Sequence, residues 1–116
     1  MIVWACCILA LTSWPSPPEA ISSVPGSDKV AHFTVYAILG YLVARALLAP
    51  VSVRIRLNAI TAMVIFGFVD ELHQVLIPGR SASLWDWTAD AVGATTGLLF
   101  GLHLLSLARA RQDLTT

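Results

Sequence analysis

The sequence predicts an all-α membrane protein, a polytopic bundle of four transmembrane helices. Of its 116 residues, 57% are hydrophobic and only 12% are charged, and the mean hydropathy is +0.76. Soluble domains carry about 25% charged residues, and a compact chain of this length has too much surface to cover with half that share. The hydrophobicity and the zero net charge exclude a disordered chain. The lack of any basic excess or basic run argues against a nucleic-acid partner.

The first apolar segment covers approximately residues 1–14 and ends at Pro15-Ser16-Pro17-Pro18, which cannot continue a helix. At ~1.5 Å per residue this segment spans about 20 Å, which is less than the ~30 Å hydrocarbon layer of a membrane. We therefore expect a first membrane helix whose N-terminal turns are missing from this sequence.

Three longer apolar segments follow, and Pro50 and Pro78-Gly79 end the first two of them. Each segment has the ~20 residues that a spanning helix needs. We predict helices over approximately 30–49, 57–77 and 84–108. A single membrane domain then covers residues 1–110, and residues 111–116 form a short cytoplasmic tail.

The basic residues predict the orientation of these helices. Five arginines flank the 50–56 loop or follow the last segment, whereas Lys29 and Arg80 lie on the other side. By the positive-inside rule, both termini and the 50–56 loop are cytoplasmic, and loops 15–29 and 78–83 face outward. All acidic residues except Asp113 then fall on the outer half: Glu19, Asp28, Asp70, Glu71, Asp86 and Asp90.

The second segment opens with a polar helix face. Asp28 and His32 are four residues apart and share this face with Tyr36. Ser27 or Asp28 has an alternative role as an N-cap after Pro25-Gly26. His32 lies inside the apolar stretch, where ionisable residues are usually functional or paired.

The third segment ends in four polar side chains within five residues. Glu71 and Gln74 share one helix face, and Asp70 and His73 lie on a neighbouring face. Because the apolar part of this segment is too short to cross a membrane alone, these side chains lie at membrane depth. They should point into the bundle or a water-filled cavity. The alternative is a polar cluster that only holds the helices together.

The loop after the third segment brings Arg80 to the outer headgroup level, next to Trp85 and Trp87 of an interfacial aromatic belt. An arginine close to a helix N-terminus suits a phosphate, a pyrophosphate or a carboxylate. The alternative is a structural salt bridge to an acidic residue nearby. Asp86 also has an alternative role, because Ser83 with Asp86 forms a capping-box pattern.

The fourth segment combines an acidic face with a glycine ladder. Asp86, Asp90, Gly93 and Gly97 follow a 4-3-4 spacing on one helix face, which Gly101 continues. Such a ladder lets another backbone approach closely, and the face presents Asp90 to its neighbours. His103, further along this helix, is predicted to be a packing residue.

Together these motifs resemble the VanZ-like family of small bacterial integral membrane proteins. The resemblance covers roughly residues 1–108 and rests on Asp28-Lys29-x-x-His32, Glu71-x-x-Gln74, Pro78-Gly79-Arg80-Ser81, Asp86-x-x-x-Asp90 and Gly93-x-x-x-Gly97. By these motifs it implies ligand-binding residues at Asp28, Lys29, His32, Glu71, Gln74, Arg80, Asp86 and Asp90, with Asp70 and His73 as secondary candidates. It also implies a place in the bacterial cytoplasmic membrane. The family's best-known member raises resistance to the glycopeptide teicoplanin, so a role in antibiotic resistance is implied as well.

Three functions stay open at this point. The first is a cell-envelope protein whose outward-facing polar pocket binds or protects a phospholipid headgroup or a lipid-linked cell-wall precursor, with Arg80 and Lys29 meeting the phosphate. The second is a membrane-embedded hydrolase or transferase that uses a divalent metal or acid–base chemistry on a lipid-linked phosphate. No HExxH, serine elbow or DxDxG pattern supports an enzyme, and no cofactor is predicted. The third is an interaction protein whose glycine face binds a second copy or a partner.

Overall fold

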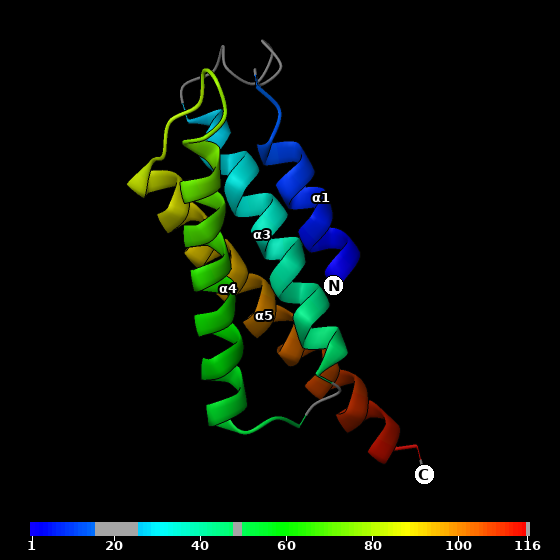
Figure 1. Cartoon of the computed structure of the whole chain (residues 1–116). Helices are drawn as coiled ribbons and strands as arrows, with labels where there is room; N and C mark the ends of the chain where they lie inside the picture. The colour runs from blue at the N-terminus through cyan, green and yellow to red at the C-terminus, as the bar shows by residue number, and fades with distance from the viewer. Residues whose placement is uncertain (16–25, 48–49, 116) are drawn as a thin grey trace.

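The computed structural model describes residues 1–15, 26–47 and 50–115, and within these ranges the chain is all-α. Four helices follow one another and no strand occurs among the described residues (Figure 1): α1 (Ile2–Thr12), α3 (Ser27–Ala46), α4 (Val53–Gln74) and α5 (Leu84–Asp113). The predicted helical fold class is thereby confirmed. Glu19 and the end of the second predicted segment, residues 48–49, lie outside the described residues.

The helix boundaries follow local capping. Ser52 and Ser83 precede α4 and α5, and each hydroxyl accepts a hydrogen bond from the backbone three residues on, at 3.3 Å. Gly26, with φ of 83°, is the N-cap of α3, so the interpretation of Ser27 or Asp28 as the cap is wrong. The last helix runs five residues beyond its predicted end at 108 and includes the start of the predicted tail.

The helices alternate in direction along the long axis of the molecule. Figure 1 shows the start of α3, the end of α4 and the start of α5 at one end, and the α3–α4 connection with the C-terminus at the other. The first group carries the predicted outer polar residues. The second carries the five arginines that are predicted to be cytoplasmic.

The packing of α3 against α5 brings the two backbones together. A Cβ added at Gly97 would collide with the backbone of Ala37, and one added at Gly93 with the backbone of Phe33. Likewise, a Cβ added at Gly40 of α3 would collide with the backbone carbonyl of Ala94 on α5. The glycine face of α5 is therefore covered by α3 of the same chain. A second copy could bind this face only if α3 left it.

The described surface is apolar and part of the interior is charged. Large apolar side chains on α4 and α5 are exposed, among them Ile65, Phe68, Leu72, Leu99, Phe100 and Leu107. By contrast, Asp70, Glu71 and Asp90 are buried. This distribution is the reverse of that in water-soluble proteins.

Among the described helices, α5 alone is long and apolar enough to qualify as a membrane span by length and composition, while α1 is apolar but shorter. The four predicted spans are therefore not all found by this criterion. α3 and α4 miss it because they carry the polar site residues at one end and arginines at the other.

Candidate functional site

Three buried ionisable side chains from three helices meet in the interior. His32 on α3 lies 2.9 Å from Asp90 on α5, measured from Nδ1 to Oδ1, and 4.0 Å from Oε1 of Glu71 on α4. Their exposed fractions are 8%, 1% and 3%. The glycine contacts between α3 and α5 make this approach possible, because Phe33 and Gly93 pack backbone to backbone next to His32 and Asp90.

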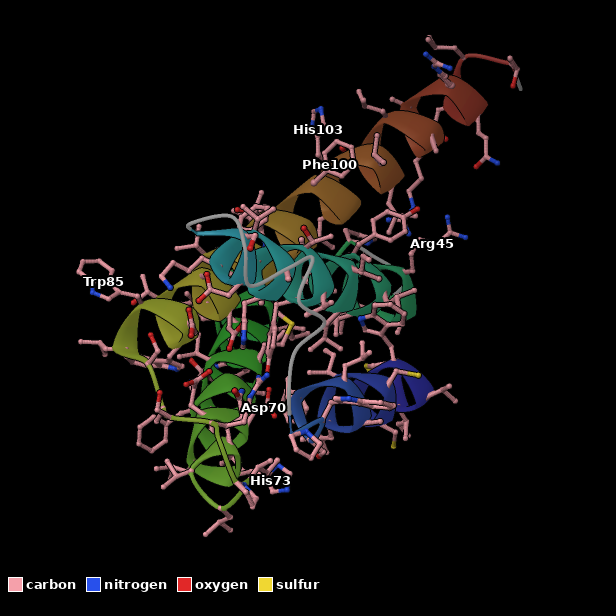
Figure 2. All side chains as sticks on the ribbon, turned by 90° about the horizontal axis from the view of Figure 1, so that it is seen from above. Arg45, Asp70, His73, Trp85, Phe100 and His103 are labelled. Atoms are coloured by element: carbon pink, nitrogen blue, oxygen red, sulfur yellow. The ribbon has the colours of Figure 1, made fainter. Side chains whose placement is uncertain are left out.

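A second polar group surrounds Asp70, which is fully buried. Thr12 donates a hydrogen bond to Asp70 Oδ1 at 2.7 Å, and the Tyr36 hydroxyl donates one to Oδ2 at 3.2 Å. Figure 2 shows Asp70 between α4 and α1. Asp70 therefore joins α1, α3 and α4 through two hydroxyl donors. The sequence marked Asp70 as a secondary candidate and gave Thr12 no role.

The loop after α4 is tied to the helix by a chain of hydrogen bonds. Arg80 Nη2 donates to Gln74 Oε1 at 2.6 Å, and Gln74 Nε2 donates to Glu71 Oε1 at 3.2 Å. Glu71 Oε2 accepts from the backbone N–H of Ser83 at 2.7 Å. Glu71 thus contacts both His32 and the loop. It is the centre of a polar cluster, which consists of His32, Glu71, Gln74, Arg80 and Asp90.

The Arg80 guanidinium contacts an amide rather than a carboxylate of the described residues. Within the described ranges no acidic side chain forms an ion pair with it, and its hydrogen-bond partner is the neutral amide of Gln74. The alternative of a structural salt bridge is therefore wrong for the described residues. Gln74 is itself buried, and its side-chain amide holds the Arg80 guanidinium in position.

Lys29 lies in the first turn of α3, ahead of the apolar segment, and its ammonium group contacts two carboxylates. Its Nζ is 2.9 Å from Asp28 and 3.1 Å from Asp86. The hydrogen bond from Lys29 holds the pKa of Asp28 below its usual value, and Asp28, followed by Asp86, raises the pKa of Lys29. Although Ser83 caps α5 as predicted, the Asp86 carboxylate faces Lys29, so Asp86 links α5 to α3.

Other predicted residues lie away from this cluster. His73 is half-buried, and its Nδ1 has no hydrogen-bond partner among the described residues. His103 is exposed and, like Trp85, points away from the other helices in Figure 2, so its prediction as a packing residue is wrong. Trp87 donates from Nε1 to the Val64 carbonyl at 3.1 Å and joins α5 to α4.

The grooves found on the described surface are apolar. One of about 420 Å³ lies between α3 and α5 and is lined by Phe33, Tyr41 and Phe100 among others. Another of about 240 Å³ is lined by residues that include Leu39 and Met63. Neither contains a residue of the polar cluster. The outward-facing polar pocket remains a prediction.

The comparison with known families agrees with the motifs. The model of the family described as VanZ/LLP1 matches residues 1–106. The chain belongs to the VanZ/LLP1 family. No curated protein and no solved structure matches it. Every polar residue of the site lies inside the matched region of this VanZ/LLP1 protein, and family membership together with α5 supports a membrane protein.

Proposed function

We propose that this VanZ/LLP1 protein is a multi-pass protein of the bacterial cytoplasmic membrane whose outer polar site binds the phosphate of an envelope lipid or lipid-linked cell-wall precursor through Arg80. The observation that carries the proposal is the Arg80 guanidinium, which is positioned by Gln74 and paired with no carboxylate of the described residues. Arginine offers several N–H donors in a planar fork that matches phosphate oxygens.

The membrane arrangement is supported by length and by surface character. At ~1.5 Å per residue, α3 with its 20 residues and α4 with its 22 are about 30 and 33 Å long, close to the ~30 Å hydrocarbon core. His32, Asp70 and Glu71 on these two helices are buried in the bundle, as expected of ionisable groups at membrane depth. With α3, α4 and α5 spanning, the start of α4 and the C-terminus are cytoplasmic and Arg80 faces outward.

Lys29 has a different role in this proposal from the one that the sequence predicted. Two carboxylates already neutralise its ammonium group, so it has less charge to offer a phosphate than Arg80 has. We assign Lys29 to holding the outer ends of α3 and α5 together. Phosphate binding then falls mainly to Arg80, with Gln74 and Glu71 positioning it.

The test is the affinity for a phosphate-bearing lipid. The full chain in mild detergent, with EDTA present, is titrated with short-chain phosphatidylglycerol and, separately, with farnesyl diphosphate. Hydrogen bonds to charged groups are worth about 1.5–3 kcal/mol, so Arg80→Gln should weaken binding by about tenfold or more. Arg54→Gln, at the opposite end of α4, is the matched control and should bind like the wild type.

The two ligands separate the two sources of the phosphate. Tighter binding of phosphatidylglycerol favours a phospholipid headgroup, and tighter binding of farnesyl diphosphate favours a lipid-linked precursor. Equal affinity of the wild type and Arg80→Gln for both would refute the proposal. Teicoplanin resistance stays a prediction, and the minimum inhibitory concentration in cells expressing the wild type or Arg80→Gln tests it.

A hydrolase or transferase is the second candidate, because His32, Glu71 and Asp90 combine a base with two carboxylates at close range. It requires turnover of the bound lipid phosphate, with loss of turnover but not of binding in His32→Ala. Homo-oligomerisation also stays a prediction. Because α3 covers the glycine face, an oligomer would use the exposed apolar faces of α4 or α5.

A further inference from the structure

We propose that His32, Glu71 and Asp90 form a binding site for one divalent transition-metal ion, of the Zn²⁺ or Mn²⁺ type. One ring nitrogen and one oxygen from each carboxylate lie within 4.8 Å of one another, and all three residues are buried. The proposal does not depend on phosphate binding by Arg80, because the three ligands come from other residues.

The separations of the ligand atoms suit a single ion. Metal–ligand bonds of about 2.1 Å in a tetrahedral site place ligand atoms about 3.4 Å apart. Nδ1 of His32 lies 2.9 Å from Oδ1 of Asp90 and 4.0 Å from Oε1 of Glu71, so these two separations lie on either side of that value. The 2.9 Å contact is a hydrogen bond between His32 and Asp90, which ligation of the ion would replace.

The charge of the interior is consistent with a bound cation. The described buried side chains include three carboxylates, on Asp70, Glu71 and Asp90, and one imidazole, that of His32. Within the described ranges, the hydrogen bonds that Asp70 accepts come from two hydroxyl groups. Buried charges are normally paired or coordinated to a metal, because an uncompensated charge in a low-dielectric interior is costly. A divalent ion would balance Glu71 and Asp90 together.

An unpartnered oxygen gives independent support. Asp90 is 99% buried, and its Oδ2 has no hydrogen-bond partner among the described residues. This atom lies in the interior near Gly67 of α4, where an added Cβ would be only 3.5 Å from it. An unpaired carboxylate oxygen at this depth requires an explanation, and a bound ion is one that fits the neighbouring ligand atoms.

The ligand types indicate which ions fit. Imidazole favours transition metals and carboxylates are shared by Zn²⁺ and Mn²⁺, whereas Mg²⁺ and Ca²⁺ prefer oxygen ligands alone. Three protein ligands also leave a coordination position for water or another ligand, as in catalytic rather than structural zinc sites. We therefore expect Zn²⁺ and Mn²⁺ to bind and Mg²⁺ to compete poorly.

The experiment uses the metal alone. The full chain in mild detergent is stripped with EDTA, dialysed, and titrated by calorimetry with ZnCl₂ and with MnCl₂ in the absence of added lipid. We expect one ion per chain, and at least about a hundredfold lower affinity in His32→Ala and in Asp90→Asn. His103→Ala is the matched control, because it removes an exposed histidine from α5, and it should bind like the wild type.

X-ray absorption of the zinc-loaded wild type keeps the test independent of variant folding. A first shell with one imidazole nitrogen and carboxylate oxygens supports the proposal. A shell without imidazole, affinity unchanged in Asp90→Asn, or the absence of stoichiometric binding by the wild type would overturn it. Since the lipid titrations contain EDTA and use Arg80→Gln, failure of the metal site leaves the phosphate proposal standing, and the reverse also holds.

Discussion

Replacing Gly97 with alanine tests how strictly α5 must approach α3. The new Cβ would lie 2.7 Å from the carbonyl carbon of Ala37 and 2.9 Å from its Cα. Nonbonded carbon atoms prefer about 3.5–4.0 Å. The two helices would therefore have to separate by roughly 0.8 Å or more at this point. Backbone atoms cannot rotate out of the way as a side chain can.

The cost follows from that displacement. Inserting a methyl group into a well-packed interface typically lowers the free energy of unfolding by about 1–3 kcal/mol. The higher helix propensity of alanine offsets at most about 1 kcal/mol of this loss. We expect the free energy of unfolding to fall by about 2 kcal/mol, because both helices are shifted as units. Gly67→Ala is the matched control, since its nearest neighbours are side-chain atoms of Asp90 and Tyr36 at 3.2 and 3.4 Å.

The assay is reversible unfolding in mild detergent, followed by helical circular dichroism as SDS is added. Gly97→Ala should shift the transition to markedly lower denaturant, and Gly67→Ala should change the unfolding free energy by less than about 1 kcal/mol. A Gly97→Ala protein as stable as the wild type would refute the close backbone packing of α3 and α5. An equal loss of unfolding free energy in Gly67→Ala would show that backbone contacts at Gly97 are no stricter than side-chain contacts at Gly67.

Two further predictions concern the polar contacts. Thr12→Val removes the buried donor to Asp70 and should destabilise the protein by about 1.5–3 kcal/mol, measured by the same unfolding assay, whereas Thr88→Val at an exposed site should have little effect. Lys29 lowers the pKa of Asp28. The contact between them therefore stabilises the folded protein above the ordinary aspartate pKa, and this stabilisation is lost as the pH falls through the lowered pKa. The Tm difference between the wild type and Lys29→Met should therefore be steady near neutral pH and decrease below about pH 4; a difference independent of pH down to acid unfolding would contradict this role.

Much of the candidate site could be predicted from spacing along single helices. The three-residue interval between Glu71 and Gln74, which are joined by a hydrogen bond, follows from helix periodicity, whereas Asp28, four residues from His32, pairs with Lys29 instead. Contacts between helices could not be predicted in this way. Thr12 is an unremarkable residue in an apolar segment, and only the docking of α1 beside α4 brings it to Asp70.

The partners of Lys29 and Arg80 show the same limit. The two look equivalent in the sequence, as basic residues near helix ends on the side that is predicted to face outward. The structure pairs Lys29 with two carboxylates and Arg80 with an amide. The difference depends on which helix ends meet, a property that no local pattern records.

The sequence alone determined the helical class, the family and the separation of acidic and arginine-rich ends, because hydropathy, helix periodicity and charge counts are local properties of the chain. The tertiary structure alone decided that the glycine ladder serves α3 rather than a second copy. It also decided that His32, Glu71 and Asp90 converge while His73 and His103 do not. These outcomes depend on the rotation and depth of each helix against its neighbours, which are set by packing between residues distant in the chain.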